Sequence, residues 1–264
     1  MSYQIYRADW ETKFFGFPIG NLELSADYDA AEFEKSLQFG QEHCRLLCIT
    51  LQKEGPDSLP TGDAPCVCYD RKLTFKRPVP KNVPPLDLHV KSYASSFCSP
   101  ALERLAIQSG GMTRFKNDPE LSAHFERLFL TWINYSVTGG LADSIWTWRE
   151  EKTDVGLATI RCARRTNPTT GLKEREGRIG MFAVDEKYRR RGIGSQLFDA
   201  CDFWCSSLDI PVNSIITQKD NAAMISLCTK IGFQVKHEET VYHYWSPNWL
   251  YDTRRGWCRQ RNVI

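Results

Sequence analysis

The sequence has no apolar segment long enough to cross a membrane. A spanning helix needs about 20 apolar residues, whereas the longest apolar runs, such as 46–51, have the length of a strand. The first residues also lack the hydrophobic region of a secretory signal. Positive residues barely outnumber negative ones: 34 Lys and Arg against 32 Asp and Glu give a formal net charge of +2. We therefore expect a cytoplasmic protein that binds neither membranes nor nucleic acids.

Spacing typical of metal ligands is missing too. Among the ten cysteines, Cys66 and Cys68 are too close together for the C-x₂-C spacing of a zinc site. The pairs at 44/48 and 201/205 are four residues apart, and no pair of histidines follows them at ligand distance. Without a secretory signal, thiols are expected to stay reduced rather than form a disulfide framework. We interpret most of the cysteines as small buried side chains and expect no metal.

The composition is that of a globular protein with two parts. Hydrophobic residues make up 42% and charged residues 25% of the 264 positions. Four prolines fall at 78–85. Because proline removes a backbone donor and fixes φ, this stretch is typical of a linker. We expect a smaller N-terminal domain at 1–82 and a larger domain at 83–264.

Hydrophobic spacing predicts both helices and strands, which indicates an α/β (α+β) fold class. In the first domain, 30–43 has the period of a helix with Phe33 and Leu37 on one face. The predicted strands lie at 45–52, 66–75, 144–148, 155–162, 178–184 and 213–218. The polar stretch 163–177 is expected to form a hairpin loop. The run from Arg161 to Arg178 is rich in both charges, which is more typical of a solvated loop than of a phosphate clamp.

The segment most informative about chemistry is a strand, a glycine turn and a helix in direct succession. The helix shows apolar residues at helical spacing from Leu197 onward, and Asp199 and Asp202 are expected to point away from its buried face. The first turn of a helix has N–H groups without partners and carries partial positive charge, so it attracts phosphate. The residues of this candidate phosphate site are Arg189, Arg190, Arg191, Gly192, Ile193, Gly194 and Ser195.

Two common phosphate-binding motifs can be excluded at this turn. The pattern G-x-x-x-x-G-K-[ST] is absent, and G-x-G-x-x-G is incomplete because position 197 is Leu. What remains is [R/Q]-x-x-G-x-[G/A], which resembles the coenzyme A loop of the GNAT superfamily of acyl-CoA-dependent N-acetyltransferases. A second GNAT motif, an Asn that opens a helix ending in Gly-Phe, is similar to the run from Asn221 to Gly232 and Phe233. Asn is also a residue type suited to capping the start of a helix, and Gly is suited to capping its end.

The resemblance implies a fold and a cosubstrate. GNAT proteins have a central mixed, twisted sheet flanked by helices, so this fold is implied here. Acetyl-CoA is the implied cosubstrate, with its pyrophosphate on the loop and its pantetheine arm between two parallel strands that separate. The backbone of Phe182, Ala183 and Val184 would pair with the pantetheine amides, beside the helix opened by Asn221.

A narrower resemblance covers almost the whole chain. Segments 10–16, 111–118, 132–136 and 242–245 are similar, in this order, to segments of two-part GNAT enzymes of the dTDP-fucosamine acetyltransferase type. The resemblance implies that the N-terminal domain is a truncated, non-catalytic relative of the GNAT fold. It also implies that the acceptor is the amine of a nucleotide-linked 4-amino-deoxy sugar.

The sequence departs from the family at one catalytic position. Many GNAT enzymes have a Tyr seven residues after the helix-opening Asn, and this Tyr protonates the departing thiolate. Here that position is Cys228, whose sulfur is too close to the backbone to reach the same point. Cys228 is therefore either a proton donor or a packing residue. His243 is a second candidate donor, on the strand face opposite to Tyr242 and Tyr244.

Three alternatives stay open. The acceptor can be another amine, on a protein or a small molecule, or the chain can be a coenzyme A-binding pseudoenzyme that lacks the usual Tyr. The tail after Trp245 can pack on the core or on a second subunit, which would make a homodimer.

Overall fold

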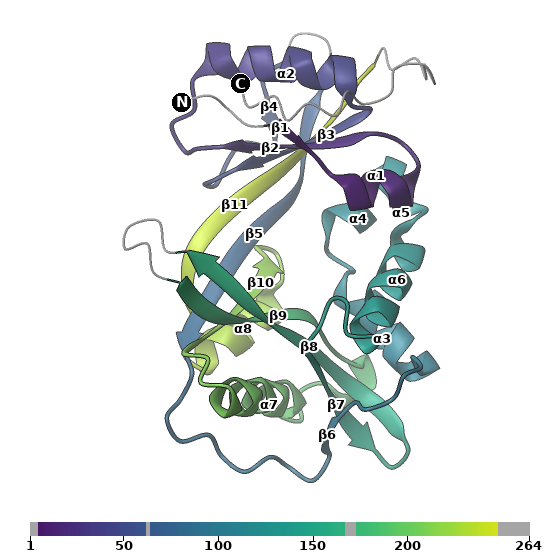
Figure 1. Cartoon of the computed structure of the whole chain (residues 1–264), viewed down its shortest axis with the longest axis vertical. Helices are drawn as coiled ribbons and strands as arrows, with labels where there is room; N and C mark the ends of the chain where they lie inside the picture. Colours follow the sequence, from purple (N-terminus) through teal and green to yellow (C-terminus); the bar gives the residue numbers. More distant parts are fainter. Residues whose placement is uncertain (1–4, 62–63, 167–172, 248–264) are drawn as a thin grey trace. The chain divides into compact units, whose positions relative to one another are not determined.

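The computed structural model describes residues 5–61, 64–166 and 173–247 (Figure 1). The chain forms two compact units, which we call unit 1 and unit 2. Unit 1 contains the described residues up to Lys72 and those from His237 onward, and unit 2 is Leu73–Lys236. This grouping differs from the boundary expected at residue 82. Two strands, β5 (Cys66–Pro78) and β11 (Gln234–Trp245), contribute residues to both units.

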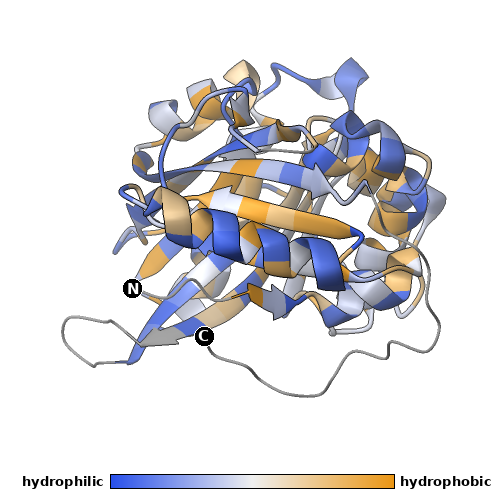
Figure 2. Ribbon diagram, turned by 90° about the horizontal axis from the view of Figure 1, so that it is seen from above, coloured by the Kyte–Doolittle hydropathy of each residue, from blue (hydrophilic) through white to orange (hydrophobic). Residues whose placement is uncertain are grey.

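Unit 1 contains the predicted helix α2 (Ala30–His43), which begins and ends where the sequence pattern indicates. Asp29 caps it by accepting a hydrogen bond from the Glu32 N–H at 2.9 Å. Phe33 and Leu37 are buried, as their spacing predicts. In Figure 2, hydrophilic and hydrophobic segments alternate along the turns of this helix, as expected for a helix with one buried face.

The strands of unit 1 form a mixed arrangement. β2 (Ile19–Leu24) runs parallel to β3 (Leu46–Leu51), with α2 as the crossover, and antiparallel to β1 (Ile5–Arg7). The C-terminal part of β11 is antiparallel to β3, with Tyr242 opposite Ile49. The short strand β4 (Ser58–Leu59) pairs with β5, and α1 (Asp9–Phe15) connects β1 to β2. The strands predicted at 45–52 and 66–75 are thus confirmed.

Unit 2 also contains a mixed sheet. Its strands are β6 (Val90–Ser92), β7 (Ser144–Glu150), β8 (Thr153–Thr166), β9 (Lys173–Val184) and β10 (Val212–Gln218). Strands β6 to β9 are consecutive antiparallel neighbours, whereas β9 and β10 are parallel. The parallel step needs a crossover, and α7 (Ile193–Ser207) supplies it.

Helices cover both faces of the unit 2 sheet. One hydrophobic cluster joins α7 to Ile160, Ile179 and Phe182. Another joins α3 (Pro100–Ser109) and α6 (Phe125–Val137) to Leu157 and Ala183. Adjacent residues of one strand belong to different clusters because side chains alternate between the faces of a sheet. The shorter helices are α4 (Arg114–Asn117), α5 (Pro119–Ser122) and α8 (Ala222–Lys230). The predicted mixed α/β class is confirmed.

The prediction of a loop at 163–177 is wrong for most of this stretch. β8 continues to Thr166 and β9 begins at Lys173, and these two residues are the last pair of the ladder. Charged residues therefore occupy the outer ends of two long strands, where Arg164, Lys173, Glu174 and Arg175 are exposed to water. Residues 167–172 lie outside the described residues.

Most of the described cysteines are buried, as expected for small packing residues. Within the described residues, six of the nine cysteines are buried, all nine are free thiols, and no group of His, Cys, Asp and Glu is arranged to hold a metal. No helix in the described part of the chain is both long and apolar enough to cross a bilayer.

Candidate functional site

The parallel strands β9 and β10 of unit 2 separate partway along their length. Their ladder runs from Asn213 opposite Gly177 to Ile215 opposite Ile179. Beyond this last pair, β9 continues to Val184 and β10 to Gln218. The backbone groups on the facing edges of these two ends are therefore not used by the ladder, which is the arrangement that the pantetheine arm was expected to need.

Alternation along β9 determines which of its N–H groups face the gap. The Met181 N–H donates to Thr159 Oγ1 at 2.8 Å, and the Asp185 N–H donates to the Val155 carbonyl at 2.9 Å, so both point toward β8. The N–H groups of Phe182 and Val184 consequently point to the opposite edge, toward the gap. The backbones of three residues were expected to contact pantetheine. Phe182 and Val184 direct their N–H groups toward the gap, whereas Ala183 directs its N–H group toward β8.

The turn after β9 is held in a conformation that leaves the start of α7 open. Arg190 has φ 64° and Gly192 has φ 82°, so two residues of the turn are left-handed. Gly192 is the N-cap residue, no side chain caps the helix, and the first turn contains no acidic residue. The N–H groups of Ile193 and Gly194 are thus available to an anion, and the helix dipole favours one there.

Two of the three arginines stabilise this turn. Arg189 Nε donates to the Val184 carbonyl at 3.1 Å, which ties the turn to the end of β9. The guanidinium of Arg191 lies over the ring of Tyr188, with 5.1 Å between its central carbon and the ring centroid. All three arginines are exposed, so they also place positive charge around the uncapped helix end.

Asn221 connects the end of β10 to α8. Its side-chain oxygen accepts from the Met224 N–H at 3.2 Å, and its Nδ2 donates to Thr217 Oγ1 at 3.1 Å. The predicted N-cap is confirmed. Gly194 has a steric role in the same region, because an added Cβ would lie 2.7 Å from Leu227 Cδ2. The glycine therefore allows α7 and α8 to pack closely.

Cys228 has the surroundings of a packing residue. It is completely buried in the cluster that contains Phe198 and Phe233. Burial raises the pKa of its thiol to about 12. An ordinary thiol has a pKa of about 8.5, so a thiol at 12 is a poor proton donor to a departing thiolate.

His243 belongs to unit 1. The turn at 189–192, which we call the phosphate turn, belongs to unit 2, as do Asn221 and Cys228. The imidazole is fully buried and its ring centroid lies 5.1 Å from that of Tyr69. Tyr242 and Tyr244 both belong to one hydrophobic cluster of unit 1, which agrees with the prediction that they share a strand face. The role of His243 as a proton donor stays a prediction.

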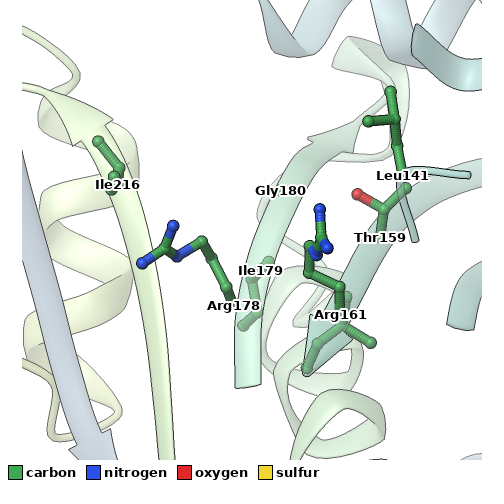
Figure 3. A pocket seen from close by; sticks show the side chains of 8 residues that line it. Leu141, Thr159, Arg161, Arg178, Ile179, Gly180 and Ile216 are labelled. Atoms are coloured by element: carbon green, nitrogen blue, oxygen red, sulfur yellow. The ribbon is translucent and has the colours of Figure 1, made fainter. Parts of the chain in front are cut away.

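A cavity of about 220 Å³ opens on unit 2 where β9 and β10 begin to separate (Figure 3). Gly180 and Ile216, the residues directly after the last ladder pair, both line it. Arg161 and Arg178 contribute its positive charge and Leu141 part of its apolar wall. Its lining residues are Leu141, Thr159, Ile160, Arg161, Arg178, Ile179, Gly180 and Ile216.

The position of Asp202 corrects the expectation that it faces away from the core. Asp202 is 1% exposed, forms an ion pair with Arg77 and accepts a hydrogen bond from Asn213 Nδ2 at 2.5 Å. Burial raises the pKa of its carboxyl group to about 6. The sequence could have predicted that Asp202 lies on the buried face, because it follows the buried Phe198 by four residues and residues four apart share a helix face.

Comparisons with known proteins agree with this geometry. Residues 111–233 match the model of the acetyltransferase (GNAT) family. The chain is similar to a tandem GNAT protein from the clavulanic acid biosynthesis pathway, with 13% identity, a TM-score of 0.50, and coverage of 88% of this chain and 76% of that one. It is also similar to a functionally unknown conserved protein from Staphylococcus epidermidis ATCC 12228, with 11% identity, a TM-score of 0.51, and coverage of 86% and 84%. No curated protein matches the chain.

At these identities the two solved structures support the fold alone, and the family match covers the segment that contains the turn after β9. The separated strands β9 and β10 and the uncapped start of α7 both lie within residues 111–233, the segment that matches the acetyltransferase (GNAT) family model.

Proposed function

We propose that this protein transfers an acetyl group from acetyl-CoA to the amine of a nucleotide-linked 4-amino-deoxy sugar. Acetyl transfer is supported by the gap between β9 and β10, which lies next to the uncapped start of α7. The acceptor class is supported by the order of the motifs at 10–16, 111–118, 132–136 and 242–245. Unit 2 then contains the catalytic machinery, and unit 1, which includes most of the domain expected at 1–82, is a non-catalytic helper.

The residues of the turn suit the phosphates of coenzyme A. The N–H groups of Ile193, Gly194 and Ser195 bind the pyrophosphate, because the helix has no side-chain cap that competes for them. The exposed guanidinium of Arg190 adds positive charge at the same place. Asn221 acts at a distance from the phosphates, by holding α8 to the end of β10.

The edge of β9 suits the thioester arm and the reaction itself. The N–H groups of Phe182 and Val184 donate to the amides of the arm or to the oxyanion that forms when the amine attacks. Bound acetyl-CoA supplies the activated acetyl group. The amine must be neutral to attack, and the departing thiolate takes up one proton. Of the two donors expected from the sequence, Cys228 is buried as a packing residue, and His243 stays a prediction.

The test is acetyl transfer measured by the release of coenzyme A thiol. Purified protein is incubated with acetyl-CoA and a panel of dTDP- and UDP-linked 4-amino sugars, and each product is checked for the added acetyl mass. Turnover of one of these sugars supports the proposal. Turnover of simple amines or protein amines in place of all sugars would contradict the acceptor class and leave acetyl transfer intact.

The burial of Cys228 gives a specific reason to consider a second function. Without a Tyr at this position and with a weakly acidic thiol, the chain could bind coenzyme A without catalysing transfer. Titration calorimetry with acetyl-CoA separates the two functions. Tight binding without turnover of any acceptor in the panel would favour the binding module.

A further inference from the structure

The peptide unit between Val184 and Asp185, at the end of β9, is hydrogen-bonded by three different segments of unit 2. The Asp185 N–H donates to the Val155 carbonyl of β8 at 2.9 Å. The Val184 carbonyl accepts from Arg189 Nε of the phosphate turn at 3.1 Å and from Gln108 Nε2 of α3 at 2.9 Å. A carbonyl oxygen has two lone pairs, and both are used here. The orientation of this peptide unit is therefore fixed from three directions.

This peptide unit lies between the two groups of backbone donors that we propose for the cosubstrate. Before it along the chain are the N–H groups of Phe182 and Val184, which face the gap. After it come the phosphate turn and the N–H groups of Ile193 and Gly194 at the start of α7. Because a peptide unit is planar and rigid, its orientation sets the direction in which the chain leaves β9. A rotation at this point would therefore move one group of donors relative to the other.

Gln108 is the side-chain donor that connects this peptide unit to a distant segment. Arg189 follows Val184 by only five residues and belongs to the turn whose placement is in question. Gln108 is 76 residues away from Val184 in the sequence. Its helix packs on the face of the sheet opposite α7, since the two helices belong to different hydrophobic clusters. The Gln108 amide thus ties the end of β9 to a part of unit 2 that lies outside both the strand and the turn.

The end of α3 provides Gln108 with a firm support. Ala106 is completely buried in the cluster that also contains Ile133 of α6. Directly after α3, Gly110 allows the two helices to approach closely, because an added Cβ would lie 2.1 Å from Phe129 Cζ. The helix end that carries Gln108 is therefore held against α6 and the sheet, and it cannot follow a movement of β9 without losing these contacts.

We propose that Gln108 is a positioning residue for coenzyme A, because it holds the edge of β9 and the phosphate turn in the relative placement that lets one ligand bind both. The inference rests on the proposed function in one respect, namely that acetyl-CoA is the cosubstrate. It deepens that function by assigning the residue that sets how the two ends of the cosubstrate are bound together. Gln108 acts through the peptide unit at Val184 and has no direct part in the chemical step.

The physical reason is the gain in affinity of a ligand that occupies two sites at once. Coenzyme A carries a pyrophosphate and a pantetheine arm in one molecule, so after one part has bound, the other part is at a high effective concentration. This gain is lost when the spacing of the two sites no longer fits the ligand. A change in their relative placement should therefore weaken the binding of the whole cosubstrate and spare a fragment that binds at one site only.

The first test compares coenzyme A with ADP, which has the pyrophosphate and lacks the arm. Both ligands are titrated by calorimetry into the full wild-type chain, into Gln108→Met and into Arg104→Met. Methionine has nearly the shape of glutamine and no N–H donor in its side chain. Arg104→Met is the matched control, because Arg104 is exposed on the same helix one turn before Gln108. If Gln108→Met does not fold, Gln108→Asn takes its place, since its amide is one methylene too short to reach the Val184 carbonyl.

We expect Gln108→Met to bind coenzyme A about 5- to 10-fold more weakly, as for the loss of one hydrogen bond, and to bind ADP within about 2-fold of wild type. The control should bind both ligands as wild type does. The inference is overturned if the affinity of the variant for coenzyme A stays within about 2-fold of wild type. It is also overturned if ADP loses as much affinity as coenzyme A, because Gln108 would then affect the phosphate turn alone.

The second test separates this inference from the proposed function. With any acceptor that turns over, Gln108→Met should raise KM for acetyl-CoA and leave KM for the acceptor unchanged. A wild-type protein that does not bind coenzyme A would remove both the proposed cosubstrate and the role of Gln108. Acetylation of a sugar, with equal affinity for coenzyme A in wild type and variant, would keep the function and remove the role of Gln108. Selective loss of coenzyme A binding in the variant, without acetyl transfer to any acceptor, would keep the role of Gln108 and remove the proposed function.

Discussion

The guanidinium of Arg77 on β5 and the carboxylate of Asp202 on α7 form an ion pair in the interior of unit 2. Arg77 also donates to the Ile231 carbonyl and lies over the ring of Phe233, 4.7 Å from its centroid. One buried pair thus connects a strand and a helix to the end of α8. This buried pair thus supports the part of unit 2 that contains the two strands of the gap.

Removing the charge of Asp202 should destabilise the protein strongly. Asp202→Asn leaves the Arg77 guanidinium buried without its counter-charge, which costs about 3–5 kcal/mol. Urea unfolding measures the change in unfolding free energy. Asp199→Asn is the control, because Asp199 lies on the same helix and forms no ion pair with any described residue, and its variant should lose far less. A loss below about 1 kcal/mol for Asp202→Asn would argue against this role.

The stability should depend on pH through Glu176. Burial raises the pKa of this carboxyl group, but hydrogen bonds from Lys76 and Ser214 outweigh burial, so that the pKa is lowered below the ordinary value of 4.5. A lowered pKa means that the stabilisation is present above pH 4.5 and is lost as the pH falls through the folded-state pKa. The difference in unfolding free energy between wild type and Glu176→Gln should therefore shrink on acidification. A difference that is constant from pH 7 to about pH 3 would contradict this assignment.

Gly192→Ala should weaken acetyl-CoA binding through the backbone of the turn. Gly192 has φ 82° with open space around it, so the obstacle to a side chain is conformational strain of about 1 kcal/mol. We expect KM for acetyl-CoA to rise about 10-fold, as the N–H groups lose their alignment with phosphate. Gly139→Ala is the matched control, because Gly139 also has a left-handed φ of 81° and open space. It should lose similar stability with an unchanged KM.

Cys228→Ala should leave turnover almost unchanged. The thiol is fully buried and has a pKa of about 12, so neither its exposure nor its acidity suits proton donation. We expect kcat within about 2-fold of wild type and a loss of about 1–2 kcal/mol in stability. Cys201→Ala, another fully buried thiol in the same cluster, shows the effect of packing alone. A fall in kcat that Cys201→Ala does not share, with a shifted pH profile, would make Cys228 the donor.

Arg161→Gln should preserve or raise thermal stability. The substitution relieves the repulsion between Arg161 and Arg178, which is worth about 0.2–1 kcal/mol. Thermal unfolding at low salt, without ligand, measures this gain, and added salt should abolish it. A lower unfolding temperature at low salt would show that Arg161 stabilises the fold through a contact of its own.

The local structure of this protein could be predicted well from its sequence, because hydrophobic period and capping residues act over short distances. The helix at 30–43, its buried face at Phe33 and Leu37, and the N-cap at Asn221 agree with the pattern. Gly232 follows the C-cap residue Ile231 and has a left-handed φ of 87°. The phosphate turn could be located for the same reason. Its glycines, its arginines and the following helix are adjacent in the chain.

Features that depend on pairing between distant segments could not be predicted in the same way. Arg161 and Arg178 become neighbours through the register of β8 and β9, and their spacing in sequence gives no sign of it. The grouping of β11 with the N-terminal residues likewise depends on its pairing with β3. Asp202 is the exception. Its place on the apolar face was visible, but an acidic residue there was expected to be exposed because its partner, Arg77, lies on another element.

The pairing of β11 with β3 has a consequence for how the chain is made. Unit 2 is one continuous stretch, so all of its residues have left the ribosome once Lys236 has emerged. Unit 1 lacks the strand next to β3 until synthesis has passed Trp245. Domains generally fold in the order of their synthesis, from the N-terminus onward. Here the part that begins first is completed last, and the newly made unit 1 exposes the unpaired edge of β3 while unit 2 is being translated.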